Sequence, residues 1–253
     1  MERSAPDILK PFDGCRLVDL SPAIYTNMPA WPAHPDVVVV ADARNYRQSG
    51  YFAQTLILSE HSASHVDAPA HMHESLSART IDTYPIEKFM GPAKLIDLSD
   101  YELGPGDCAV EEQLRRYMAA AGLSLSPGDF VLLRFGWTPY EQPYEERSYW
   151  ERNSPGLSDD ACRYLAEQGI SGVGSDTLGC DVAMRRGKVV SAFGHMTHFL
   201  PRDILIYEGL VNLADVTPES FFMALPLRVV GGSGAPFRGI AVCPVADPAG
   251  AMP

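Results

Sequence analysis

The chain of 253 residues carries 20 Lys and Arg against 32 Asp and Glu, which gives a formal net charge of −12 and a pI near 4.9. So acidic a surface repels a phosphate backbone, and a nucleic-acid partner is not expected. Hydrophobic residues make up 46% of the chain and charged residues 21%, a balance typical of globular proteins. No apolar run approaches the roughly 18 residues of a membrane-spanning helix, so no membrane partner is expected.

The five cysteines are scattered along the chain, and none forms a CxxC pair. This spacing is typical of reduced, buried thiols rather than of a disulfide framework or a cysteine zinc site. The first seven residues, Met1–Asp7, show no basic start followed by an apolar run. Together these features predict a cytoplasmic protein.

Many short strands and a few helices are expected in chain order. The strand candidates are Cys15–Leu20, Val37–Ala41, Tyr51–Ser59, Ala93–Leu98, Phe130–Leu133, Ile170–Ser175 and Ile204–Tyr207. Helices are predicted over Val110–Ala121, ending before Gly122, and over Ser158–Gln168, with Ser158 as N-cap and Gly169 as stop. Phe221–Val230 and Gly239–Val245 predict a β-hairpin around a mobile Gly231–Gly234 loop. The sequence therefore predicts one mixed α/β domain over residues 1–253.

Four of the seven histidines fall between residues 61 and 73. Imidazole and carboxylate are ligand types for zinc or manganese, so His61, His65, Asp67 and His71 form a candidate metal cluster. If the segment turns helically, the spacing of four places His61 and His65 on one face. Pro69 interrupts regular structure and lets His71 return from a loop. The alternative is a loop of solvated histidines, or a helix end capped by nearby serines.

The segment His61–His71 resembles the HxGTHxDxPxH signature of the putative cyclase family, which includes bacterial kynurenine formamidases and isatin hydrolases. Ala63 and Ser64 replace the glycine and threonine of the signature, and its ligating positions are intact. Further resemblance runs through Asp19–Pro22, Met28–Pro32, Arg134–Trp137, Ser175–Thr177 and Ile206–Leu213. The resemblance implies an α/β domain with a barrel-like β core flanked by helices. It also implies a homo-oligomer, a dimer or tetramer, in which the N-terminal segment reaches a neighbouring subunit.

The same resemblance implies His61, His65, Asp67 and Glu208 as ligands of one or two divalent ions, Zn²⁺ or Mn²⁺. Taken alone, Glu208 is equally an ordinary carboxylate at a strand end. Where the family has a further histidine, twelve residues before this glutamate, the present chain has Met196. His195 is the favoured replacement and His198 its rival.

His71 is the candidate general acid and base, because imidazole titrates near neutral pH and the signature gives this position that role. His73 is the local rival, and His71 as a metal ligand is the other alternative. In the same way the resemblance implies Trp31 as a substrate-binding aromatic, although an aromatic beside prolines often only packs its loop.

The leading functional hypothesis is a metal-dependent hydrolase of a C–N bond in a small molecule, an aryl formamide or a cyclic amide. One alternative keeps the same metal site and opens a lactone, or carries out a cyclisation or dehydration. Another is a non-catalytic protein with a structural metal, whose site would be closed by four protein ligands.

Overall fold

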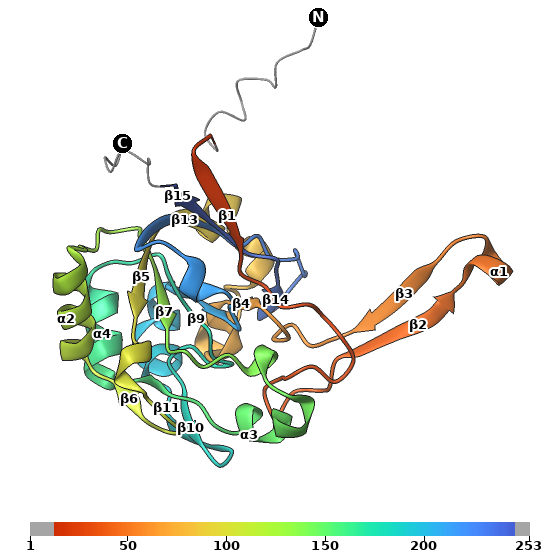
Figure 1. The fold of residues 1–253 in the computed structure, drawn as a ribbon, viewed down its shortest axis with the longest axis horizontal. Coiled ribbons are helices and arrows are strands. Elements are labelled where there is room, and N and C mark those ends of the chain that lie inside the picture. The colour runs from red at the N-terminus through yellow and green to blue at the C-terminus, as the bar shows by residue number, and fades with distance from the viewer. Residues whose placement is uncertain (1–12, 246–253) are drawn as a thin grey trace, which may run out of the picture.

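The computed structural model describes residues 13–245, and one nine-stranded sheet runs through this part of the chain (Figure 1). Its strands follow the spatial order β1-β15-β13-β5-β7-β9-β12-β4-β14. They are β1 (Cys15–Asp19), β4 (His65–Asp67), β5 (Met90–Asp97), β7 (Phe130–Arg134), β9 (Gly172–Ser175), β12 (Leu205–Glu208), β13 (Glu219–Met223), β14 (Gly234–Pro236) and β15 (Ile240–Pro244). The pairs β5-β7, β7-β9 and β9-β12 are parallel, and the other neighbours in the sheet are antiparallel.

Smaller elements surround this sheet. Three two-stranded pairs lie within residues 13–245: β2 (Val38–Arg44) with β3 (Ala53–Ile57), β6 (Cys108–Ala109) with β8 (Gly156–Leu157), and β10 (Ala183–Arg185) with β11 (Lys188–Ser191). The helices are α1 (Tyr46–Ser49), α2 (Glu111–Ala121), α3 (Arg147–Glu151), α4 (Asp159–Glu167) and the π-helix η9 (Gly194–His198). Single 3₁₀ turns are η2 (Pro69–His71), η3 (Glu74–Leu76), η4 (Ile81–Thr83), η5 (Ile86–Phe89), η6 (Ser99–Tyr101), η7 (Pro139–Glu141), η8 (Tyr144–Glu146), η10 (Leu200–Arg202) and η11 (Leu213–Asp215).

The connection between β14 and β15 shows that the sheet is strongly curled. Seven strand spacings separate these two strands, about 34 Å in a flat sheet at ~4.8 Å per spacing. Only four residue steps lead from Pro236 to Ile240, and they span at most about 15 Å. The two edges of the sheet must therefore approach each other, which confirms the predicted barrel-like β core flanked by helices.

Alternation along β7 places two hydrophobic cores on the two faces of the sheet. Phe130 and Leu132 pack in the core inside the curl, together with Tyr207. Val131 and Leu133 face the opposite way, into a core shared with α2 and α4. Since every second residue of a strand points to the same face, the side that each residue of β4 and β12 takes follows from its place in the strand.

The predicted strands and helices are confirmed with small shifts of their ends. Each of the seven strand candidates overlaps an observed strand, and α2 and α4 lie inside the two predicted helices, with Gly122 and Ser158 as caps. The predicted C-terminal hairpin is wrong in one respect. β13 and β15 do pair, but the segment between them also supplies β14, at the far edge of the sheet. Met1–Asp7, used above to predict location, lie outside the described residues.

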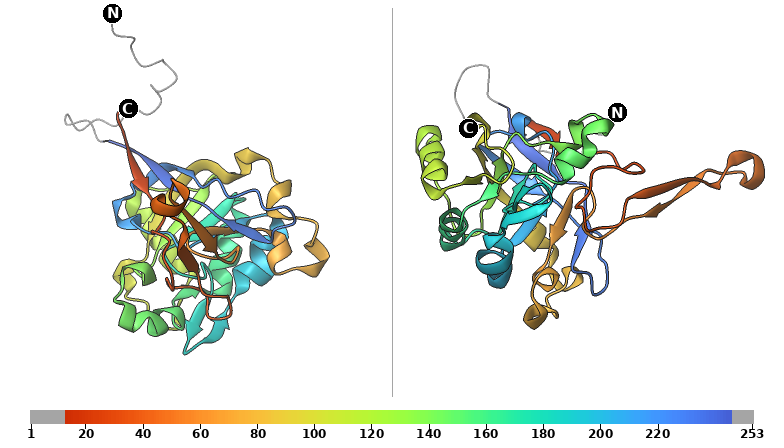
Figure 2. Two further views of the ribbon diagram at one scale, coloured as in Figure 1. Left: turned by 90° about the vertical axis from the view of Figure 1, so that its right-hand side faces the viewer. Right: turned by 90° about the horizontal axis from the view of Figure 1, so that it is seen from below.

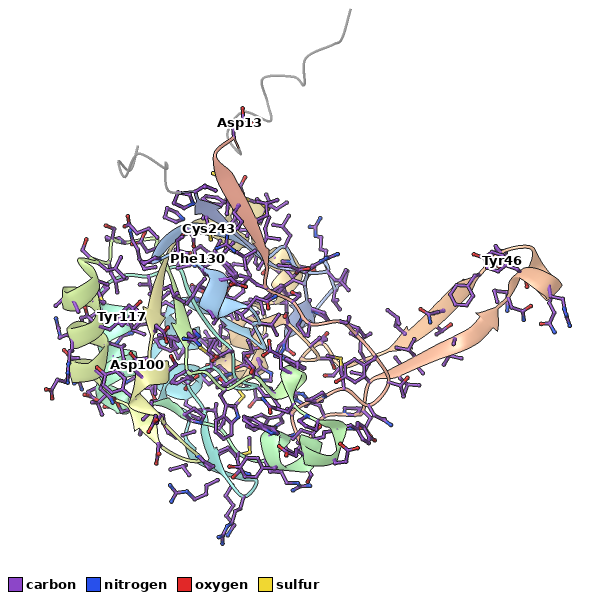
Figure 3. The ribbon with its side chains drawn as sticks, in the orientation of Figure 1. Asp13, Tyr46, Asp100, Tyr117, Phe130 and Cys243 are labelled. Atoms are coloured by element: carbon purple, nitrogen blue, oxygen red, sulfur yellow. The ribbon has the colours of Figure 1, made fainter. Side chains whose placement is uncertain are left out.

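The pair β2–β3, capped by α1, projects from the body as an arm (Figures 1 and 2). Figure 3 shows Tyr46 at its far end, well away from the side chains of the body. No residue of α1 is buried, and four of the five residues of β3 are exposed. Among all helices of residues 13–245, the arm included, none has the length and apolarity needed to cross a bilayer.

Candidate metal centre

The antiparallel pairing of β4 with β12 joins the first two site residues. Glu208 lies opposite His65 in the register, although 143 residues separate them in the sequence. Directly opposite residues in such a pair have neighbouring side chains on one face. His65 Nε2 accordingly lies 3.3 Å from Glu208 Oε2 and 3.5 Å from Asp67 Oδ1. Val66 points into the other core, so His65 and Asp67 share the helix-covered face.

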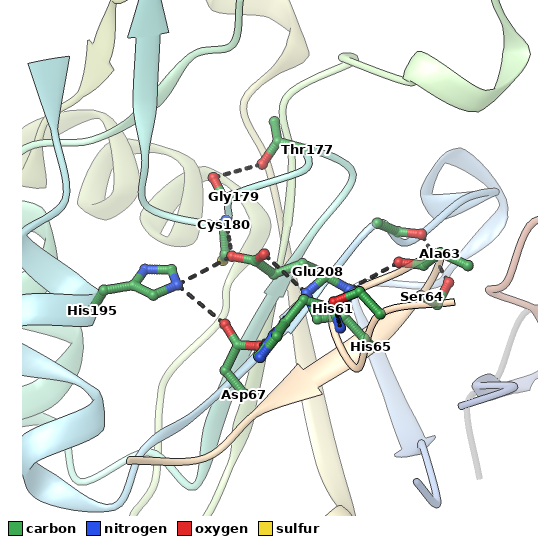
Figure 4. A network of polar contacts seen from close by, with 12 residues as sticks. His61, Ala63, Ser64, His65, Asp67, Thr177, Gly179, Cys180, His195 and Glu208 are labelled. Carbon is green, nitrogen blue, oxygen red and sulfur yellow. Dashed lines mark hydrogen bonds and ion pairs between the residues drawn. The ribbon is translucent and has the colours of Figure 1, made fainter. Parts of the chain in front are cut away.

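Residues 61–67 of the signature segment are not helical, so the condition under which His61 and His65 would share a helix face is not met. His61 lies in a turn, and His65 begins β4. They still converge, because His61 Nδ1 lies 2.6 Å from Asp67 Oδ1 (Figure 4). The convergence comes from a strand and a turn that meet at one carboxylate.

Ala63 aims its carbonyl at His65 through a left-handed backbone conformation. Its φ is 56°, and a glycine, as in the family signature, would adopt this conformation without strain. The Ala63 carbonyl accepts a hydrogen bond from His65 Nδ1 at 2.9 Å. Since a carbonyl is only an acceptor, His65 carries its proton on Nδ1. Its bare Nε2 therefore faces Asp67 and Glu208.

The π-helix η9 supplies His195 from a distant part of the chain. His195 Nε2 lies 3.2 Å from Asp67 Oδ2 and 3.4 Å from Glu208 Oε1. Its Nδ1 bonds the fully buried carboxylate of Asp181, which also accepts the N–H groups of Gly194 and His195. The aspartate thus fixes the ring and leaves Nε2 directed at the cluster. The rival histidine, His198, bonds Asp159 on α4 at 2.8 Å.

Burial and charge act in opposite directions on these groups. Burial alone would raise the pKa of Asp67, but the charge of nearby His61 and the close contacts with His195 and His61 hold it well below its usual range. For His65 and His195 burial would lower the pKa, and the surrounding carboxylates outweigh it and raise both values. An ionised Asp67 therefore lies among the imidazoles of the cluster.

Nitrogen and oxygen donors of this kind suit a borderline divalent cation. The described residues contain two groups of candidate ligands, and within each group the ligand atoms lie within 4.8 Å of one another. One group is His65, Asp67 and Glu208, and the other is His61, Asp67 and His71. Asp67 belongs to both groups. The Cys180 N–H donates to Glu208 Oε1 at 2.8 Å and so orients this carboxylate. Imidazole nitrogens and carboxylate oxygens that face one another form a donor set that fits Zn²⁺ or Mn²⁺.

His71 lies beside this cluster at the end of η2. Its ring centroid is 3.9 Å from that of His61 and 6.1 Å from that of His195. Burial brings the pKa of His71 down to about 4; the charge of Asp67 opposes this shift and the neighbouring histidines add to it, so the ring is neutral near pH 7. His73 points elsewhere, with its Nε2 2.8 Å from the backbone carbonyl of His195.

The cluster forms the polar end of a cavity of about 490 Å³. Its apolar wall consists of Trp31, Met72, Leu178, Val182, Val189, Ala192 and Met196. Trp31 shares a turn with His34, whose N–H donates to the Trp31 carbonyl at 2.9 Å. His34 also lines the cavity, and burial lowers its pKa. None of the fourteen lining residues is Lys or Arg.

Two contributors to this site carried no recognised sequence signal. Asp181 follows a lone cysteine outside any motif, and only the fold brings it beneath His195. His34 lies in the proline-rich loop that also carries Trp31, and its closeness to that candidate aromatic was the available clue. The sequence-derived candidates His61, His65, His71, His195 and Glu208 all line the cavity.

A family model described as "Putative cyclase" matches residues 18–182, well over half of the chain. The chain therefore belongs to this family, and the predicted family membership is confirmed. An isatin hydrolase from Roseibium aggregatum is 27% identical over 247 residues, covering 91% of this chain and 92% of that protein. A kynurenine formamidase from Salinibacter ruber is 28% identical over 235 residues, covering 88% of this chain and 96% of that protein.

Solved structures share the fold. An isatin hydrolase bound to the product analogue thioisatinate superposes with a TM-score of 0.82 at 23% identity, covering 96% of this chain and all of that one (100%). A structure described as a potential metal-dependent hydrolase with cyclase activity gives a TM-score of 0.65 at 28% identity, covering 94% and 100% of the two chains. The names of these relatives agree with the predicted class, a metal-dependent hydrolase of amide-type C–N bonds.

Proposed function

We propose that this protein is a metal-dependent hydrolase that cleaves a non-peptide C–N bond in an aryl formamide or a cyclic amide. The observation that carries the proposal is the meeting of His65, Asp67, Glu208 and His195, with His71 beside them, at one end of an otherwise apolar cavity. The names of the family members, isatin hydrolase and kynurenine formamidase, support the same bond type.

His61, His65, Asp67, Glu208 and His195 would hold one or two ions, Zn²⁺ or Mn²⁺. A divalent ion there supplies an acidified water and polarises the substrate carbonyl. Asp67 belongs to both groups of candidate ligand atoms, so its carboxylate would be available as a ligand to either of two ions. The favoured nitrogen ligand from η9 is His195 rather than His198, since His198 is directed at α4.

His71 is the proposed general base and acid. A neutral ring can accept a proton from the attacking water, and the same ring can then deliver it to the leaving nitrogen. The lowered pKa of about 4 supports the neutral form at the start of the cycle. The group His61–Asp67–His71 also supports the alternative in which His71 is a ligand, and the variant described in the Discussion separates the two roles.

The cavity favours a flat, uncharged substrate. The wall formed by Trp31, Leu178 and Val182 offers apolar contact, and we propose that the Trp31 ring packs against the aryl group. No cationic side chain among the lining residues is available to pair a substrate carboxylate. A cyclic amide or simple aryl formamide therefore fits better than a substrate with a charged tail.

The test is metal analysis followed by assays on isatin, N-formylkynurenine and a simple aryl lactone. We expect at least one equivalent of divalent ion, loss of activity on chelation, and faster turnover of the uncharged amide. Turnover of the lactone alone would favour the lactonase alternative. A protein without bound metal whose activity resists chelators would refute the metal-dependent hydrolase. A tightly bound ion without turnover would favour a structural role, which the open cavity argues against.

We further propose a homo-oligomer, a dimer or tetramer, in which the arm β2–β3 docks on a second copy of the chain. The large apolar side chains exposed along the arm are Val40, Tyr46, Tyr51, Phe52, Leu56 and Ile57. A two-stranded hairpin without a core of its own is marginally stable, and exposed apolar groups of this size mark interaction surfaces. The expected partners remain small-molecule substrate and a second copy, with nucleic acid disfavoured by the acidic charge.

We propose a cytoplasmic location on the strength of the thiols. Cys108, Cys162, Cys180 and Cys243 form no disulfide, and the last three of them are buried. Buried thiols that form no disulfide are typical of a reducing compartment. Fractionation of the producing cells tests this, and recovery of the activity outside the cytoplasm would contradict it.

A further inference from the structure

We propose that Ser233 and Glu60 are positioning residues that set which ring nitrogen of His61 carries the proton. The inference deepens the metal centre of the proposed function and rests on it. The observation is a chain of short contacts that ends on the first histidine of the signature. His61 Nε2 lies 2.8 Å from Ser233 Oγ, and Glu60 Oε2 accepts from both the hydroxyl and the N–H of Ser233, at 2.8 and 2.9 Å.

The glycine-rich segment at 231–234 brings Ser233 to this place. A Cβ at Gly234 would lie 2.7 Å from His61 Cε1 and 2.6 Å from a backbone oxygen, so no larger residue fits there. Backbone bonds anchor the segment, because its residues 232 and 233 accept from the N–H groups of Ile81 and Ala68, both at 2.9 Å. The loop thus has a defined position against the metal centre.

Counting protons gives the chain of contacts a direction. A serine hydroxyl has one proton, and an ionised carboxylate only accepts. The hydroxyl of Ser233 therefore donates to Glu60, and its oxygen is left to accept from His61 Nε2–H. The proton of the neutral ring is then on Nε2, and the Nδ1 lone pair is free.

The free Nδ1 faces Asp67 Oδ1 at 2.6 Å, so two acceptors oppose each other. This arrangement is favourable only with a cation or a proton between them. His65 and His195 are oriented by a carbonyl and a carboxylate, which cannot donate. His61 depends instead on a hydroxyl, which can donate as well as accept, and Glu60 removes that ambiguity.

The experiment compares the wild-type chain with Ser233→Ala, Glu60→Gln and the control Ser99→Ala. Ser99 also donates its hydroxyl to a carboxylate, that of Asp97 at 2.7 Å, and does not line the cavity. Metal-stripped full-length proteins are titrated with Zn²⁺ and with Mn²⁺ by calorimetry. We expect Ser233→Ala to weaken binding about 10- to 100-fold, as for other groups that orient metal ligands. Glu60→Gln should also weaken metal binding, because the amide N–H can donate to the Ser233 hydroxyl and so reverse the direction of that hydrogen bond. Ser99→Ala leaves it unchanged.

A second measurement follows the proton itself. In the ¹⁵N-histidine-labelled, Zn²⁺-loaded wild type we expect the His61 proton on Nε2, and in Ser233→Ala rapid exchange of that proton with water. A His61 proton on Nδ1, or equal metal affinity in wild type and Ser233→Ala, would overturn the relay while leaving the metal centre intact. A wild type that binds neither ion would overturn the proposed metal centre and the relay together.

Discussion

The metal centre and the arm differ in how firmly contacts with the rest of the chain hold them in place. Around Asp67, groups from β4, β12 and η9 meet within hydrogen-bonding distance, and Asp67, Asp181 and Glu208 are buried. Along the arm, Tyr46 is 73% exposed, and its ring stacks on that of Phe52 with the centroids 6.2 Å apart. The metal centre is held from several sides, whereas the arm is held mainly by its own ladder and, near its base, by hydrogen bonds between Thr26 and Val39.

The two regions are nevertheless continuous in sequence. The arm begins just after the loop of Trp31 and His34, and it ends at Ile57, four residues before His61. Arg147 steadies the base of the arm by ion pairs with Asp36, at 2.6 Å, and with Glu151. In the proposed oligomer, docking of the arm would therefore act on the segments that lead into the buried site.

The largest expected effect is that of Asp67→Asn. Removing this carboxylate takes away the group that faces three histidines, so metal content should fall below one equivalent. Since bound metal supplies several kcal/mol of transition-state stabilisation, kcat/KM should fall by about 10³-fold or more. Metal analysis and steady-state kinetics check both. Asp100→Asn, on the exposed surface, is the matched control, and equal losses in the two variants would contradict the prediction.

His71→Ala should separate chemistry from metal binding. We expect kcat to fall about 10²- to 10⁴-fold, the usual contribution of a general acid and base, with the metal content unchanged. His73→Ala, the local rival, should have a much smaller effect because its ring bonds a backbone carbonyl instead of lining the cavity. Loss of metal in His71→Ala would make His71 a ligand.

Substitutions in the arm should change the oligomeric state of the protein and leave its stability nearly unchanged. Replacing Tyr46 and Phe52 by serine should dissociate the oligomer in analytical ultracentrifugation. The unfolding free energy of the separated chain should change by only about 0.5 kcal/mol or less, as for exposed substitutions generally. Tyr144→Ser, which alters an aromatic residue 62% exposed on the body, is the control. An unchanged sedimentation coefficient in the arm variant would refute the docking role.

The smallest effect concerns an ion pair that belongs to neither region. Burial raises the pKa of Asp97, but hydrogen bonds from Ser99 and Arg134 lower it more, and the net pKa is below 3.8. A carboxylate with a lowered pKa stabilises the fold above its unfolded pKa, and this stability is lost as pH falls through the folded value. Asp97→Asn should therefore cost about 1 kcal/mol at pH 7. In urea titrations the difference from wild type should shrink below pH 3.8, and a constant difference down to pH 2 would contradict this assignment.

The histidine cluster and most elements were predictable because their signals are local. Strand candidates such as Phe130–Leu133 are short apolar runs between turn residues, and α4 carries its own cap in Ser158. The order His61, His65, Asp67, His71 was also enough to indicate metal chemistry. The spacing of these residues left the local conformation open between a helical turn and a loop, and pairing with β12 makes His65–Asp67 a strand.

The sequence by itself determined the class of chemistry, because ligand types and their spacing are properties of neighbouring residues. The tertiary structure decided which distant groups complete the site. It directed His195 rather than His198 toward Asp67, brought Asp181 beneath His195, and carried Ser233 to His61 from 172 residues away. These choices depend on sheet register and on where a π-helix packs, which are set by many weak long-range contacts. No short stretch of sequence records them.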